Sequence, residues 1–129
     1  MAGDYSAYSE SFIAAADLRL LKDRFVTLTA ANTVNICGAG GKILGVLKNA
    51  PNIGHAARVQ ILGMAEVLVD GSGGGDILIG SWLKSAANGI GAVTTTDKDV
   101  VGGMANAPTT AQNVLIEVVL TGPFTLSAA

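Results

Sequence analysis

Short strand-like stretches rich in apolar residues run through most of this chain, two of them (residues 25–29 and 33–37) with apolar and polar residues in alternation, and glycine-rich turns separate them. Alternation with a period of two is typical of β-strands that have one buried face. The stretches lie at residues 25–29, 33–37, 43–48, 56–62, 65–69, 77–83, 92–95, 99–105 and 112–121. Short strands, glycine turns and little helix predict an all-β fold, either a small β-barrel or a sandwich.

One pair of stretches predicts a local hairpin. Residues 56–62 and 65–69 flank Gly63 and Met64, and two apolar stretches separated by two residues with a glycine commonly form a hairpin. Asn88-Gly89 is an equally short separator and a strong signal for a tight turn.

The stretch 112–121 is the longest in the chain. Its nearly continuous apolar run suits a strand that is buried on both sides or that places one face in an oligomer seam. We expect Gly122-Pro123 to end it, because proline cannot donate to a β-ladder.

The first sixteen residues lack strand alternation. Tyr5, Tyr8 and Phe12 are three and four positions apart, a spacing that places them on one face of a helix. The segment is either a flexible terminus or an arm that orders on a partner and docks its aromatic side chains there, and the sequence leaves both open. We therefore expect an arm at residues 1–16 and a single β domain at residues 17–129.

The composition predicts an interface. Half of the residues are hydrophobic, only 14% are charged against a usual ~25%, and the mean hydropathy is +0.48. No stretch approaches the ~20 apolar residues of a membrane-spanning helix. The surplus apolar surface is therefore expected in a homo-oligomer or partner interface, and no membrane association is expected.

Charge and targeting signals narrow the function further. The net charge is −2 and the basic residues are scattered, whereas direct nucleic-acid binding needs a basic patch or stripe. The first residues lack the basic and apolar regions of a signal peptide, which indicates synthesis in a cytoplasm, including that of a host cell. The lone Cys37 lies in an apolar stretch, where a buried and unreactive thiol is the usual state.

No catalytic set can be assembled from these residues, so we expect a protein that is not an enzyme and needs no cofactor. The sequence GAGGK at residues 38–42 lacks the first glycine and the Ser or Thr of a phosphate loop. Asp70, Ser72 and Asp76 could offer oxygen ligands to Ca²⁺, but no Glu completes an EF-hand, and a solvated loop is the plainer interpretation. His55 lacks identifiable partners for catalysis or metal binding.

Several motifs resemble those of the bacteriophage capsid decoration family, also described as head cement or stabilisation proteins. They are GVLKNAPNIG at residues 45–54, ARV at 57–59 leading to Gly63, ILIG at 77–80, the long strand at 114–120 and ADLR at 16–19. The resemblance covers residues 16–121, and its motifs are turns and strands rather than catalytic residues. Trp82 and the glycine-rich loop at residues 70–76 depart from the pattern.

The resemblance implies a virion structural protein on the outer capsid surface that stabilises the shell across capsomer junctions. The implied partners are the major capsid protein and further copies of the chain, with a trimer favoured and a dimer possible, because closed symmetry prevents open polymerisation. Two alternatives remain open: another virion component, such as a head-fibre base or tail protein, and a small ligand-binding β-barrel.

Seven residues are candidates for a capsid or subunit interface. Aromatic side chains are frequent binding anchors, and the mixed charges near residue 20 could contact a charged patch. A glutamate inside an apolar strand must face solvent or find a cation, such as Arg58 across a subunit seam. The candidates are Tyr5, Tyr8, Phe12, Arg19, Arg24, Trp82 and Glu117.

Overall fold

The structure is a computed structural model and describes residues 8–73 and 75–127. Nine β-strands form one hydrogen-bonded sheet, and the described residues contain no α-helix. The all-β prediction is therefore confirmed. The strands are β1 (Tyr8–Ala14), β2 (Phe25–Ala30), β3 (Thr33–Ile36), β4 (Gly45–Leu47), β5 (Ala56–Val69), β6 (Trp82–Ser85), β7 (Gly91–Val93), β8 (Val100–Ala105) and β9 (Val114–Thr125), and the described residues also include the 3-10 turn η2 (Ala87–Gly89).

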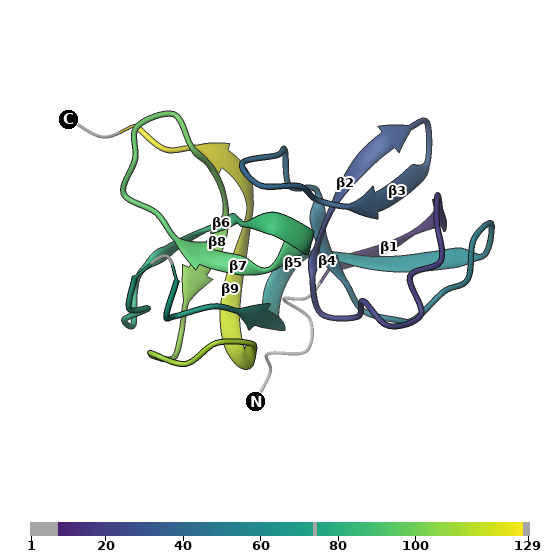
Figure 1. The fold of residues 1–129 in the computed structure, drawn as a ribbon. Coiled ribbons are helices and arrows are strands. Elements are labelled where there is room, and N and C mark those ends of the chain that lie inside the picture. The colour runs from purple at the N-terminus through teal and green to yellow at the C-terminus, as the bar shows by residue number, and fades with distance from the viewer. Residues whose placement is uncertain (1–7, 74, 128–129) are drawn as a thin grey trace.

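The sheet closes on itself twice. In the first ring, β1 pairs with β3, β3 with β2, β2 with β4, β4 with β5, and β5 with β1. In the second ring, β5 pairs with β7, β7 with β6, β6 with β8, β8 with β9, and β9 with β5. Figure 1 shows the two rings as adjacent lobes that share β5. Closure matters because it pairs strand edges that would otherwise stay open.

The strand that both rings share was expected as a hairpin, and this prediction is wrong. β5 runs without interruption for 14 residues, and its first part pairs with β1 and β4 while its second part pairs with β9. Gly63 bends the strand with φ +96°, a value that glycine adopts readily. The buried side-chain amide of Gln60 donates to the carbonyls of Leu62 at 3.1 Å and Met64 at 2.9 Å, which fixes the bend.

The amino-terminal region also differs from expectation. Tyr8–Ala14 form β1, an extended barrel strand, instead of part of an arm or a helical face. Ala14 is 1% exposed and Phe12 packs on the core of the first ring, so these residues belong to the β domain. The ladder with β5 decides this conformation, and no local signal reveals it. Residues 1–7, including Tyr5, lie outside the described part of the chain.

Two further strand boundaries depend on distant partners. Of the expected strand at residues 77–83, Ile77 makes an isolated bridge to Thr109, and β6 begins only at Trp82. β9 continues through Gly122-Pro123, because Phe124 and Thr125 pair with β8.

The tight turn expected at Asn88-Gly89 is present between β6 and β7. Both residues have the positive φ values, +63° and +72°, that such a turn requires.

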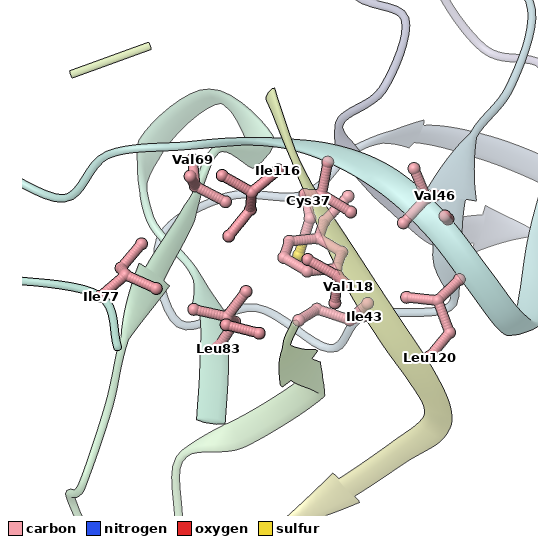
Figure 2. Close-up of a cluster of buried hydrophobic side chains, with 13 residues drawn as sticks. Cys37, Ile43, Val46, Val69, Ile77, Leu83, Ile116, Val118 and Leu120 are labelled. Atoms are coloured by element: carbon pink, nitrogen blue, oxygen red, sulfur yellow. The ribbon is translucent and has the colours of Figure 1, made fainter. Parts of the chain in front are cut away.

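Each ring has its own cluster of buried apolar side chains. The smaller cluster fills the first ring and consists of Ala14, Leu18, Val26, Val34, Leu47, Ala57 and Val59. The larger one fills the second ring, and Figure 2 shows its side chains converging from β5, β6, β9 and the segment before β4. Its members are Phe25, Cys37, Ile43, Val46, Ala65, Val67, Val69, Ile77, Leu83, Ala105, Ile116, Val118 and Leu120.

Phe25 joins the two clusters into one body. It lies on β2 of the first ring, yet its fully buried side chain belongs to the core of the second. Two glycines make room for its ring: a Cβ added to Gly102 would lie 2.8 Å from Phe25 Cε1, and one added to Gly91 would lie 3.3 Å from Cε2. The side chain of Val46, on β4 of the first ring, also packs in the core of the second ring. The outer surface of the first ring therefore forms one side of the second core.

We expect Gly102→Ala to destabilise the protein by about 1–3 kcal/mol, because its methyl group would overlap the Phe25 ring. Denaturant unfolding measures the change. Gly38→Ala is the matched control, since its Cβ would meet nothing within 4 Å, and it should lie within about 0.5 kcal/mol of wild type. The double variant Gly102→Ala, Phe25→Leu should lose less free energy of unfolding than the sum of the two single variants, because the smaller side chain leaves room for the added methyl group. Additive losses would contradict the packing of the Phe25 ring against Gly102.

Gln60→Leu should lower the free energy of unfolding by about 1–3 kcal/mol, because two carbonyls at the bend of β5 would lose their donor. The same substitution at the exposed Gln112 controls for the change of side chain and should be nearly neutral. Equal effects at both positions would show that the amide of Gln60 does not hold the bend.

Candidate interaction face

A row of large side chains crosses the outside of the second ring. The register places Met64 on β5 opposite Val119 on β9, Val119 opposite Met104 on β8, and Met104 opposite Trp82 on β6. Met64 is 46% exposed, and the other three are half-buried. A continuous apolar row on the solvent side of a sheet is the kind of surface that marks an interaction site.

An aromatic pair ends this row. The rings of Trp82 and Phe124 meet edge to face, with centroids 5.1 Å apart and an interplanar angle of 85°. This arrangement is favourable for aromatic rings and fixes both side chains. Leu62, 41% exposed, adds to the row at its other end, next to Met64 on the same side of β5. We define the outer apolar face as Leu62, Met64, Trp82, Met104, Val119 and Phe124.

Two glutamates border this face. Glu66 on β5 lies directly opposite Glu117 on β9, and both are exposed. Like charges opposite each other in an antiparallel pair repel and destabilise the sheet. Lys48 donates to the backbone carbonyl of Glu66 at 3.3 Å, but its ion pair is with Asp23 at 2.6 Å. Neither glutamate takes part in an ion pair among the described residues, so the two carboxylates border the apolar row with negative charge.

Three of the seven predicted interface residues lie on or beside this face. Trp82 belongs to it, and Glu117 belongs to its acidic border. Tyr8 stands opposite Leu62 in the β1–β5 ladder and is 46% exposed. Its hydroxyl donates to Glu10 at 2.9 Å, and this bond to a carboxylate raises the pKa of Tyr8. The expected pairing of Glu117 with Arg58 stays a prediction, since it was placed across a subunit seam.

The other candidates lie elsewhere. Phe12 packs inward on the first core, while Arg19 is exposed and donates two hydrogen bonds to Asp17, at 2.9 and 2.8 Å. Those bonds lower the pKa of Asp17 to about 2. Arg24 donates to the carbonyl of Asn88 at 3.3 Å, and its buried Nε has no partner among the described residues. Tyr5 lies outside the described residues, and an interface role for these residues stays a prediction.

Sequence reasoning missed Leu62, Met64, Met104, Val119 and Phe124. The signal was present as alternation: on β5 and β9, every second residue is buried in the second core and the residues between face outward. The outward residues could be recognised as one row only if the pairing partner of each strand were known, because the row forms when β5, β9, β8 and β6 lie side by side.

Asp70 and Cys37, which the sequence singled out, lie in structural settings. Asp70 accepts bonds from the Ser72 amide at 2.8 Å, the Ser72 hydroxyl at 2.7 Å and the Gly73 amide at 3.1 Å, and these bonds lower its pKa. Burial raises the pKa of the Cys37 thiol. Within residues 8–73 and 75–127, no group of three His, Cys, Asp or Glu side chains could hold a metal ion. None of these residues forms a helix with the length and hydropathy of a membrane span.

Comparison with known proteins identifies the fold. No protein-family model and no curated protein sequence matches this chain. The chain is similar in structure to the head fibre gp8.5 N base of bacteriophage phi29, with a TM-score of 0.66 and 18% sequence identity over 89% of this chain and 94% of that one. At this identity, the likeness shows a shared fold across almost the whole of both chains.

We expect Glu117→Lys to raise the free energy of unfolding by about 0.2–1 kcal/mol, because it replaces a repulsive cross-strand pair with an attractive one. Chemical denaturation at low and high salt measures the gain, which should shrink as salt screens it. Asp76→Lys makes the same charge change on the exposed glycine-rich loop, and a gain of equal size there would refute a cross-strand origin.

Proposed function

We propose that this chain is a structural protein of a bacteriophage virion that binds the outside of the capsid and stabilises it across capsomer junctions. The observation that carries the proposal is the outer apolar face, a broad exposed row on a doubly closed β-body. The fold shared with a phage head fibre base and the motifs that resemble the decoration family both support a virion role.

The proposed mechanism is binding without catalysis. The face lies on four paired strands, so the backbone that carries its side chains is fixed before a partner arrives and little backbone entropy is lost on docking. Large Met and Trp side chains are well suited to burial at the centre of an interface. Weak contacts at each copy add up to strong attachment when many copies bind one shell.

The proposed partners are the major capsid protein and further copies of this chain. A closed homo-oligomer, with a trimer favoured and a dimer possible, would match the rotational symmetry of a capsid site. The acidic pair Glu66 and Glu117 would then face a basic group of the partner. The repulsion between the two carboxylates would be relieved on binding, and this would favour a partner with a positive charge at that position. Nucleic acid and membrane are not among the proposed partners.

A second candidate function is the base module of a head fibre. It is favoured by one specific observation, the likeness to the phi29 head fibre gp8.5 N base over 94% of that chain. Both functions need a face that docks on the capsid. They differ in what docking does, because a cement protein strengthens the shell and a fibre base need only hold a fibre.

Cosedimentation of purified protein with undecorated, expanded capsids tests the docking. We expect the wild-type protein to bind the shells saturably. The double variant Leu62→Ser, Met64→Ser removes two exposed members of the face, so its affinity for the shells should be lower than that of wild type by about tenfold or more. The double variant Leu78→Ser, Ile79→Ser is the matched control, since these side chains are 63% and 70% exposed on a turn outside the face.

The outcomes separate the candidates. Binding lost equally in both double variants would contradict the assignment of the face, and no binding by folded protein would contradict a capsid role altogether. A truncation that tests an arm must stop before Tyr8, because β1 is a barrel strand. Resistance of the decorated shells to heat then distinguishes cement, which raises it, from a fibre base, which leaves it unchanged.

A further inference from the structure

A groove crosses the junction of the two rings. It consists of two small hollows that share Lys42 and Ile43, in the segment between β3 and β4. The larger, about 230 Å³, is completed by Val100 on β8 and by Pro123, Phe124 and Thr125 on β9. The smaller, about 180 Å³, is completed by Thr27 and Leu28 on β2 and by Leu44.

The sizes of the hollows argue against a compact ligand. Pockets for small molecules are commonly about 300–1,000 Å³, and each hollow here is below that range. Two small apolar hollows that share Lys42 and Ile43 are better matched to successive side chains of an extended chain. Extended segments bind in this way when they can also pair with an open strand edge.

β2 offers such an edge beside the smaller hollow. Its ladder with β4 ends where Val26 pairs with Gly45 and accepts a bond from the Leu44 amide at 2.8 Å. Residues two apart in a strand direct their backbone groups to the same side, so the N–H and C=O of Leu28 point where those of Val26 do, away from β3. No described strand pairs with Leu28 on that side, and its side chain is 50% exposed.

The positive charge of Lys42 favours a ligand that carries a negative charge. Lys42 lines both hollows and is the only charged residue among the nine that line them. It is exposed, and it takes part in none of the three ion pairs of the described residues. Asp99 precedes the lining residue Val100, and its Oδ2 accepts a hydrogen bond from Thr94 at 2.6 Å and pairs with Lys84 at 3.5 Å.

We propose that this groove binds an extended, acidic-apolar peptide segment of a partner protein by strand addition to the β2 edge. The segment pairs with the backbone of Leu28, places an apolar side chain in each hollow and sets a carboxylate against Lys42. The groove lies apart from the outer apolar face, with which it shares Phe124 alone, and the inference holds whether or not the partner is a capsid protein.

A library of short linear peptides displayed on particles, panned against the immobilised full-length chain, tests this proposal. We expect the selected peptides to alternate apolar residues around an Asp or Glu. Leu28→Pro removes the one amide hydrogen that the added strand needs and leaves the ladder to β3 intact, and it should abolish selection. Thermal unfolding of each variant confirms that it is folded.

If Leu28→Pro does not fold, variants that change the charge of Lys42 test the same proposal. Lys42→Glu should bind the selected acidic peptides roughly fivefold or more weakly, as expected when an attractive exposed ion pair becomes repulsive, and should itself select basic peptides. Lys22→Glu, an exposed lysine outside the groove, should leave binding unchanged.

Hydrogen exchange at the Leu28 amide supplies an independent readout, because added-strand pairing should slow it in the presence of a selected peptide. Failure to enrich any peptide, or peptides that bind wild type and Lys42→Glu alike, would overturn the proposal. So would selected peptides that leave the exchange of the Leu28 amide unchanged.

Discussion

The insertion of Phe25 between two glycines is the contact on which the rest of the structure depends. A small ring of five strands encloses few side chains, and the first ring buries only a modest cluster by itself. Phe25 and Val46 lie on strands of the first ring, but their side chains point outward into the core of the second ring. The first ring therefore forms one side of the second core. The two rings therefore form one packed body, although each keeps its own apolar cluster. Gly91 and Gly102 are needed because a Cβ at either position would press on the aromatic ring.

The shared strand β5 converts this packing into a defined outer surface. Its bend at Gly63, held by the amide of Gln60, lets one half close the first ring and the other half pair with β9. That pairing fixes the register between β5 and β9, and the register decides which side chains meet on the outside. The same register that aligns Met64 with Val119 also opposes Glu66 and Glu117, so the apolar row and its repulsive acidic border arise together.

The molecule thus presents two surfaces of different kinds. The outer apolar face is broad and lies on paired strands, which suits the flat contact of a folded partner or another copy. The groove at Lys42 is narrow, runs along an open strand edge and suits a single extended segment. Phe124 lines the groove and packs on Trp82 in the face, so the two surfaces meet at one side chain.

The sequence by itself determined the features that depend on neighbours along the chain. Short apolar stretches bounded by turn residues located most strands, and Asn88-Gly89 specified its turn through φ values that few other residues adopt. Only the tertiary structure decided that β5 is one bent strand, that Tyr8–Ala14 form β1, and that β9 passes through Gly122-Pro123. It also decided the outer apolar face, which four strands distant in sequence build together. The reason is that a strand acquires its partner, register and buried face from residues far along the chain, and local propensity encodes none of these.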